Sequence, residues 1–307
     1  MVTVKSYAKL NISLKITGVN DGFHMLDSVV MTVDLYDLVT IKKRKDDKIL
    51  VSFEGKYGFI PKLQEETNAY KAAKAFMEQY NTSGVNITII RNIPTGSGMG
   101  GSSADIVGVL KGMKQLFKID CDLKPLADSL GSDTGYLLTG GFARLYGRGE
   151  IVEPLVTDKD YYFVIMKADK AVVTKDCFKL YDEINAPSYA DNDKVVEAIK
   201  QGDLSLLSSN ACNDLYLPAT KLNEEVEKNL NILKSLNPEY ASMTGSGSTC
   251  FAIYSNYEMA SWACDKLKKT YGNKVELVYY YNPERKSFFD RLSDFLTITS
   301  HNYKTKN

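Results

Sequence analysis

The alternation of hydrophobic and polar residues predicts a long strand at the start of the chain. Within residues 2–16, apolar side chains occupy every second position from Ala8 to Ile16, and mostly polar residues lie between them. A period of two is the pattern of a strand with one buried face. It places Lys9 and Asn11 side by side on the face away from the core. That face is either a solvated surface or part of a functional site, and the pattern does not decide between the two.

Similar signals divide the rest of the chain into strands and helices. Alternation or continuous apolarity predicts strands at 28–42, 85–90, 161–166, 250–254 and 274–281, and glycine-interrupted β structure at 136–145. Apolar residues three and four apart predict helices at 106–117, 126–130 and 257–271, and the stretch 184–240 is mainly helical. Thr67 and Thr174 are the predicted N-caps of two further helices. An apolar stripe over 288–296 is expected to pack on its own domain.

A glycine-rich segment lies between a predicted strand and a predicted helix. Residues 94–105 read Pro-Thr-Gly-Ser-Gly-Met-Gly-Gly-Ser-Ser-Ala-Asp. Glycines let the backbone approach a ligand closely and adopt positive φ, and a helix N-terminus offers free N–H groups at the positive end of its dipole. The segment therefore predicts a phosphate-binding loop, with a glycine-rich turn that binds nothing as the alternative.

Three protein classes with glycine loops do not fit this sequence. A dinucleotide-binding fold would continue with a strand that ends in an acidic residue, whereas residues 118–125 do not read as a strand. A Walker A loop ends in Gly-Lys-Ser/Thr, and residues 94–105 contain no lysine. A protein kinase would carry His-Arg-Asp and Asp-Phe-Gly after its loop, and neither tripeptide occurs.

Length and composition limit the number of domains, the partners and the location that we expect for the protein. A chain of 307 residues exceeds the usual size of a single domain, so we expect two domains. Lys+Arg and Asp+Glu both number 38, so no net charge favours nucleic acid or an anionic membrane as a partner. Five cysteines without a Cys-x-x-Cys pair, and only two histidines, argue against a structural zinc site. Without a signal-peptide core or a membrane-spanning stretch, the protein is expected to be cytoplasmic.

The glycine loop and four other motifs resemble those of the GHMP kinases, in the branch that phosphorylates 4-diphosphocytidyl-2-C-methyl-D-erythritol. The other motifs are Ala8-Lys9-Leu10-Asn11, Asp21-Gly22-Phe23-His24, Leu130-Gly131-Ser132-Asp133 and Thr244-Gly245-Ser246-Gly247-Ser248-Thr249-Cys250. The resemblance covers about residues 5–255, with the motifs in the family's order. Two departures stand out: Asp133-Thr134-Gly135 replaces Asp-Val-Pro, and the loop ends Gly-Ser-Ser-Ala-Asp where the family has Gly-Gly-Ser-Ser-Asp.

The resemblance implies a fold and a reaction. The fold would be α+β with two domains, an S5-like N-terminal domain at 1–155 and a smaller ferredoxin-like C-terminal domain at 156–282, followed by a tail at 283–307. The reaction would be ATP- and Mg²⁺-dependent phosphorylation of the 2-hydroxyl of the cytidine diphosphate-linked methylerythritol, a step towards isoprenoid precursors. The protein would be a monomer or a homodimer. The alternatives are another GHMP kinase, of the mevalonate or homoserine type, and a nucleotide-binding paralogue without catalysis.

The resemblance also assigns roles to individual residues. Asp133, which the local pattern alone would make a turn residue, would accept the hydroxyl proton, and Lys9 would neutralise developing charge. Residues expected to contact ATP are Asn68, Pro94, Gly96, Ser97, Gly98, Met99, Gly100, Gly101, Ser102 and Ser103. Residues expected to contact the other substrate are Asn11, Phe23, His24, Thr174 and Phe178, with a core position as the alternative for Phe178. The second glycine loop at 244–249 would pack against the substrate or simply turn the chain.

Overall fold

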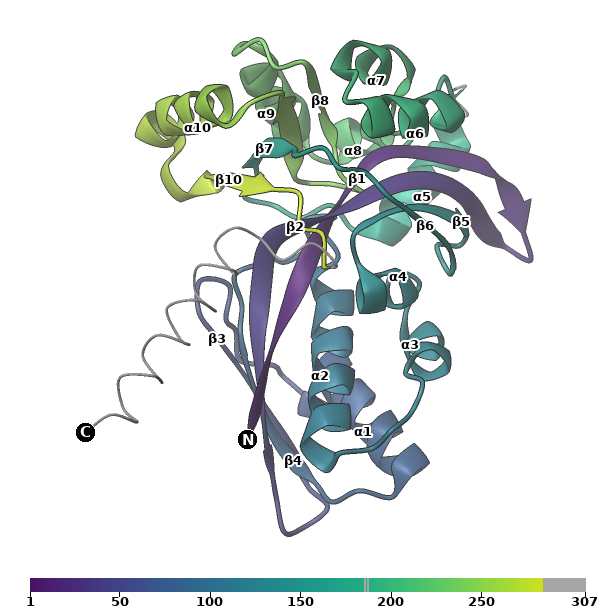
Figure 1. Cartoon of the computed structure of the whole chain (residues 1–307), viewed down its shortest axis with the longest axis vertical. Coiled ribbons are helices and arrows are strands. Elements are labelled where there is room, and N and C mark those ends of the chain that lie inside the picture. Colours follow the sequence, from purple (N-terminus) through teal and green to yellow (C-terminus); the bar gives the residue numbers. More distant parts are fainter. Residues whose placement is uncertain (185, 187, 284–307) are drawn as a thin grey trace, which may run out of the picture.

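A computed structural model describes residues 1–184, 186 and 188–283 of the chain (Figure 1). The predicted apolar stripe at 288–296 and all but the first residue of the predicted tail therefore lie outside the described residues.

The first sheet combines strands that the sequence predicted with two short strands that it did not predict, at 49–54 and 151–155. Its strands are β1 (Val2–Asn20), β2 (Phe23–Lys43), β3 (Ile49–Glu54), β4 (Val85–Ile90), β5 (Phe142–Gly147) and β6 (Ile151–Leu155). The order is β3-β4-β2-β5-β6, with β1 paired to β2, and only β3 and β4 run parallel among these described strands. The helices of this part are α1 (Asn68–Tyr80), α2 (Gly101–Phe117), α3 (Lys124–Leu130) and α4 (Thr134–Thr139).

The second sheet is antiparallel and lies in the upper part of Figure 1. Its order is β10-β7-β9-β8, formed by β7 (Tyr162–Met166), β8 (Tyr240–Met243), β9 (Cys250–Tyr254) and β10 (Val275–Tyr279). Its helices are α5 (Thr174–Ile184), α6 (Asn192–Gln201), α7 (Leu204–Asn210), α8 (Tyr216–Leu222), α9 (Glu224–Lys234) and α10 (Tyr257–Tyr271). Short 3₁₀ turns cover Gln64–Glu66 and Gly272–Lys274. The two-sheet α+β architecture confirms the predicted fold class.

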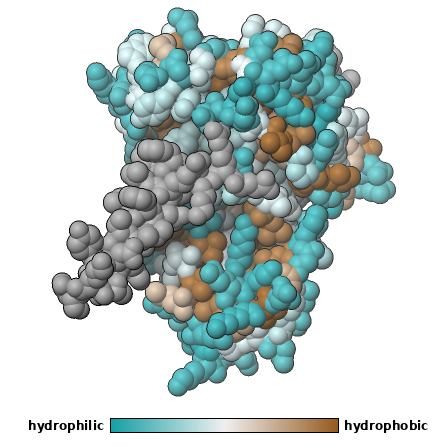
Figure 2. Space-filling view, in the orientation of Figure 1, coloured by the Kyte–Doolittle hydropathy of each residue, from teal (hydrophilic) through white to brown (hydrophobic). Residues whose placement is uncertain are grey.

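Apolar side chains form three clusters, and two of them contain residues of both sheets. The first contains Ile12 of β1 together with Phe163 of β7, Phe251 of β9 and Val195 of α6. The second includes Leu14 and Ile16 of β1. The second cluster lies between the upper sheet and helices α5, α9 and α10, and the third lies between the first sheet and α1–α3. On the face shown in Figure 2, hydrophilic residues predominate, with smaller apolar patches between them. The relative position of the sheets therefore depends on buried apolar contacts.

Two local predictions were wrong. Residues 134–139 form helix α4 and not β structure, because the strand β5 begins only after Gly140 and Gly141, which both adopt positive φ (67° and 86°). A helix of six residues is too short to show a helical period in its sequence. Thr174 is the first residue of α5 and not its N-cap, and its hydroxyl contacts Ser246 Oγ at 2.9 Å. The N-cap at Thr67 is confirmed, since its Oγ accepts from the Tyr70 amide.

None of the helices in the described part of the chain is both long and apolar enough to cross a membrane.

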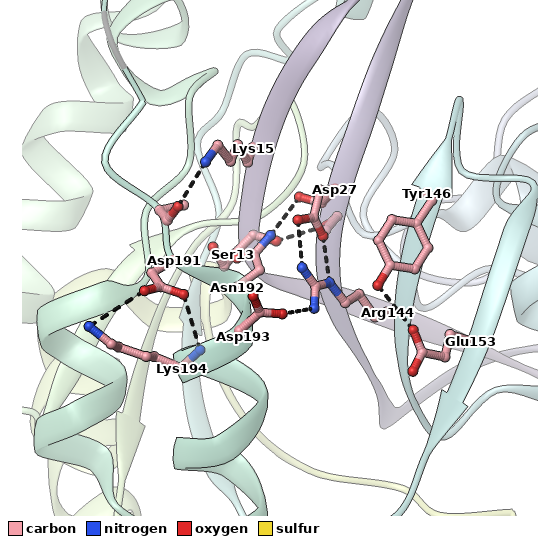
Figure 3. Close-up of polar contacts among 12 residues, drawn as sticks. Ser13, Lys15, Asp27, Arg144, Tyr146, Glu153, Asp191, Asn192, Asp193 and Lys194 are labelled. Atoms are coloured by element: carbon pink, nitrogen blue, oxygen red, sulfur yellow. Dashed lines mark hydrogen bonds and ion pairs between the residues drawn. The ribbon is translucent and has the colours of Figure 1, made fainter.

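A charged network fastens the end of the β1–β2 hairpin to helix α6 (Figure 3). The Arg144 guanidinium on β5 donates to both carboxylate oxygens of Asp27 on β2, each at 2.8 Å, and to Asp193 on α6 at 2.5 Å. Asn192 donates to the Asp27 carbonyl at 2.8 Å. The side chains of Arg144 and Asp27 are only 15% and 14% exposed, whereas that of Asp193 is 86% exposed. The Arg144–Asp27 pair is therefore the partly desolvated part of the network.

We expect Arg144→Ala to lower the free energy of unfolding by about 2–3 kcal/mol, because it leaves the Asp27 carboxylate poorly solvated and without its cation. Urea denaturation measures this loss. Asp193→Asn is the matched control and should cost less than about 1 kcal/mol, since it removes only the exposed half of the network. Equal losses for the two variants would contradict this assignment.

Candidate active site

A cavity of about 680 Å³ collects most of the residues that the sequence singled out. Its walls come from β1, β2, the loop before α2, the turn before α4, α5 from Thr174 to Asp182, and the loop before β9. The predicted residues that line it are Lys9, Asn11, Phe23, His24, Pro94, Gly96, Ser97, Gly98, Gly100, Gly101, Ser102, Ser103, Asp133, Thr174 and Phe178. Segments separated by more than 200 residues thus meet around one space.

Two predicted residues do not line the cavity. Met99 is fully buried, and its carbonyl accepts a hydrogen bond from the Lys9 amide at 3.0 Å, so it anchors the loop to β1 through its backbone. Asn68 is the first residue of α1 and is absent from the cavity wall. Contact between Asn68 and the nucleotide stays a prediction from the resemblance.

The glycine loop leads directly from β4 into α2, as predicted. Gly96, Gly98 and Gly100 adopt positive φ of 61°, 77° and 78°. Gly100 is the N-cap of α2, no side chain caps the first turn, and the first turn contains no acidic residue. The first amides of a helix have no partner within the helix, and they attract anions. This loop therefore fits the phosphates of a nucleotide.

The two glycine loops contact each other through their backbones. A Cβ atom added at Gly98 would lie 2.1 Å from the Thr244 carbonyl oxygen, and one added at Gly245 would lie 2.9 Å from the Gly98 carbonyl oxygen. The Thr249 amide donates to the Ser97 carbonyl at 3.2 Å. The second glycine loop thus supports the first.

Asn213 holds the second loop in place. Its side-chain amide donates to the carbonyls of Met243 at 2.7 Å and Gly245 at 2.9 Å, and its Oδ1 accepts from the Leu215 amide. Next to it, Asp214 accepts from the Ile16 amide of β1 at 2.7 Å. This gives a structural role to the Asn213-Asp214-Leu215 segment, whose chemistry the sequence did not reveal.

Lys9 and Asp133 approach each other on the cavity wall. Lys9 Nζ lies 3.4 Å from the Asp133 carboxylate and also donates to Asn11 Oδ1. Asn11 is fixed in turn, because its Nδ2 donates to Ser28 Oγ at 2.8 Å and its amide donates to Thr244 Oγ1 at 2.9 Å. Lys9 is 5% exposed and Asn11 4% exposed, so the solvated-surface alternative for these two residues is wrong.

Aromatic rings gather at another part of the wall. The His24 and Phe178 rings lie 4.7 Å apart at 30°, and the Arg148 guanidinium lies 4.7 Å from the centre of the Phe23 ring. His24 Nε2 is 2.7 Å from Asp182 Oδ1. Phe178 is half-buried and packs against the core of the second sheet while it also lines the cavity, and its contact with the substrate stays a prediction.

Sequence reasoning missed a buried ion pair behind the phosphate loop. Arg91, after β4, contacts the Asp105 carboxylate on α2, and it donates to Thr95 Oγ1 at 3.3 Å. Asp105 is 1% exposed, and burial, together with the nearby charge of Asp37, raises its pKa above the usual range while Arg91 opposes the shift. The pair joins the two ends of the loop. Its only signal in the sequence is one charge on each side of the glycines.

Comparison with known proteins agrees with this geometry. The model of the GHMP kinases N terminal domain matches residues 67–143, and that of the GHMP kinases C terminal domain matches residues 195–273. The chain belongs to the GHMP kinase family. It is an ATP-dependent small-molecule kinase by family, and the glycine loop gives ATP a site of suitable chemistry.

Its relatives define the branch within this family. A 4-diphosphocytidyl-2-C-methyl-D-erythritol kinase of Alkaliphilus metalliredigens is 34% identical over 286 residues, which is 92% of this chain and 97% of the relative. The enzyme of the same name from Clostridium beijerinckii is 33% identical, over 87% of this chain and 96% of the relative. A crystal structure of 4-(cytidine 5'-diphospho)-2C-methyl-D-erythritol kinase superposes with a TM-score of 0.77 at 25% identity, covering 91% of this chain and all of that one.

The contact between the glycine loops gives a testable prediction. We expect Gly98→Ala to raise the KM for ATP about tenfold or more, because the added methyl group pushes the phosphate loop away from the Thr244 carbonyl. It should also destabilise the fold by about 1–3 kcal/mol beyond the cost of positive φ. ATP titration and urea denaturation measure the two effects.

Gly272→Ala is the matched control for this variant. Gly272 also has positive φ (54°), but a Cβ atom there would meet nothing within 4 Å. It should therefore cost only the backbone strain, which at φ 54° and ψ −128° is of order 1–3 kcal/mol, and it should leave the KM for ATP unchanged. Unchanged ATP affinity in a folded Gly98→Ala variant would mean that the loop contact does not shape the nucleotide site.

Proposed function

We propose that this protein transfers the γ-phosphate of ATP to the 2-hydroxyl of 4-diphosphocytidyl-2-C-methyl-D-erythritol, a step towards isoprenoid precursors. The observation that carries the proposal is a single cavity with three chemically different parts. These are a glycine loop suited to phosphates, the Lys9–Asp133 pair, and a group of aromatic rings around His24.

Each part has a role in the proposed reaction. Phosphoryl transfer depends mainly on positioning and on neutralisation of charge. Loop amides at the N-terminus of α2 would hold the nucleotide phosphates. Asp133 would accept the hydroxyl proton, and the Lys9 ammonium at 3.4 Å would stabilise the negative charge that develops on the substrate oxygen. Asn11, fixed by Ser28 and Thr244, keeps the Lys9 side chain in place.

We include Mg²⁺ in this proposal as the partner of the nucleotide phosphates, whose charge it neutralises when bound. The described residues contain no group of three acidic, histidine or cysteine side chains placed to hold a metal ion. Magnesium commonly keeps several waters and binds through phosphates with one or two protein ligands. The Ser103 hydroxyl on the cavity wall is the ligand we propose.

Phe23, His24 and Phe178 support the cytidine end of the proposed substrate. Cytosine offers an aromatic face and a polar edge, and a site for it needs rings to stack on and hydrogen-bonding groups beside them. A kinase for mevalonate or homoserine has no cytosine to hold, so the aromatic group argues against that alternative. The close Lys9–Asp133 pair argues against a paralogue without catalysis. A cytoplasmic location and a monomeric or homodimeric state stay predictions.

Catalysis provides the first test of this proposal. Asp133→Asn should lower kcat by roughly two to four orders of magnitude, because the amide cannot accept the hydroxyl proton. ATP affinity should stay within about threefold, since Asp133 is not part of the phosphate loop. A coupled assay of ADP release measures kcat. Near-normal turnover in this variant would remove Asp133 from its proposed role.

The substrate end provides the second test. Phe178→Ala should raise the KM for the cytidine substrate about tenfold, since stacking of a base on an aromatic ring contributes about 1–3 kcal/mol. The KM for ATP should not change. Mevalonate and free methylerythritol phosphate, assayed in parallel, are the control substrates. If either reacts as well as the cytidine compound with the wild-type enzyme, the proposed substrate is wrong.

A further inference from the structure

His24 has an asymmetric environment that the proposed function leaves unexplained. Its Nε2 lies 2.7 Å from the Asp182 carboxylate, and the histidine side chain is only 15% exposed. Its Nδ1 has no hydrogen-bond partner among the described residues, although the ring lines the cavity. Phe178 on one side and the edge of Tyr181 on another restrict rotation of the ring.

The Asp182 carboxylate determines which nitrogen carries the proton. An ionised carboxylate only accepts hydrogen bonds, so the nitrogen beside it must be a donor. In a neutral histidine the other nitrogen is then an acceptor, because one ring nitrogen is protonated and one is not. Carboxylates fix the tautomer and orientation of metal-bound histidines in the same way. Nδ1 of His24 is therefore presented to a ligand in the cavity as an acceptor.

An acceptor at this place distinguishes the two pyrimidine bases. Cytosine carries an amino group at position 4 and uracil a carbonyl oxygen. An acceptor that faces this position binds the amino group and opposes the lone pairs of the carbonyl. An unsatisfied or repelled polar group in a buried site weakens binding strongly.

We infer that Asp182 is a positioning residue that holds His24 as a hydrogen-bond acceptor and thereby makes the cavity select a cytosine over a uracil nucleotide. The inference rests on the proposed function, because it deepens the recognition of the cytidine end. Asp182 lies on α5 four residues after Phe178, so one helix supplies both the stacking ring and the carboxylate that orients His24. Asp182 and His24 need not touch the atoms that react in the phosphoryl transfer.

The first experiment reads the tautomer directly, without a ligand. The chain contains only two histidines, His24 and His301, so a His301→Gln background labelled with ¹⁵N-histidine leaves a single ring to observe. At pH 8, where an ordinary histidine is neutral, the ¹⁵N shifts should show a protonated Nε2 and an unprotonated Nδ1. The Nε2 proton should be protected from exchange, and this protection should be lost in Asp182→Asn. A protonated Nδ1 in the wild-type ring would overturn the inference.

The second experiment measures base selection with CDP and UDP by calorimetry. The wild type should bind CDP more tightly than UDP. Asp182→Asn should lower the ratio of CDP affinity to UDP affinity at least tenfold, because a side-chain amide can either donate or accept and no longer holds His24 in one tautomer. Asp182→Glu, which keeps the carboxylate, should restore part of the ratio. Glu183→Gln is the matched control: it removes a neighbouring exposed charge on α5 outside the cavity wall and should leave the ratio unchanged.

The outcomes separate this inference from the function on which it rests. The Asp182 side chain is 55% exposed, so Asp182→Asn should unfold at the same urea concentration as Glu183→Gln. If the wild type binds CDP, and the ratio of CDP affinity to UDP affinity in Asp182→Asn equals that of the wild type, then only the role of Asp182 is overturned. Failure of the wild type to bind CDP overturns the cytidine proposal and this inference together, even when the cavity still binds ATP.

Discussion

The backbone contact between the two glycine loops is the constraint on which the cavity depends. Gly98 lies so close to the Thr244 carbonyl that no side chain fits between them. Thr244 also accepts from the amide of Asn11, and Asn11 contacts the Lys9 ammonium. One contact therefore links the phosphate loop, the strand that carries Lys9, and the segment before β9. Glycine is required at both Gly98 and Gly245, because a Cβ atom at either position would lie less than 3 Å from a backbone oxygen of the other loop (2.1 Å and 2.9 Å).

Local sequence patterns predicted the features that are themselves local. The period-two pattern of β1 and the glycine segment before α2 each specify a conformation within a few residues, and both were found where expected. The family resemblance then named Lys9 and Asp133, which the fold brings within 3.4 Å. The sequence pattern alone left both a solvated surface and a functional site open for Lys9, because a strand buried on both faces by distant segments has the same alternation.

The features that escaped prediction depend on contacts between distant segments. Asp182 is an ordinary exposed helix residue until the fold places it beside His24, 158 positions earlier. Arg91 and Asp105 are single charges in the sequence, and only packing of α2 against the first sheet makes them a buried pair. Helix α4 is too short to have a detectable period, so its sequence and the glycines after it predict β structure instead. Contacts between side chains that are distant in the sequence leave no periodic pattern in that sequence.

The course of β1 through the molecule has a consequence for synthesis of the protein. Leu14 pairs with residues 212–214, and Ile12 packs in the cluster that contains Phe163 and Phe251. A nascent chain that has produced only its first 200 residues lacks residues 212–214 and the strand β9, so Leu14 is still without the backbone partners that it has in the complete fold. The kinase site forms only after the segment around Thr244 has left the ribosome. Contacts that close loops of this length form slowly, so the part of β1 around Leu14 acquires its backbone partners at residues 212–214 late in folding, although the strand itself is made first.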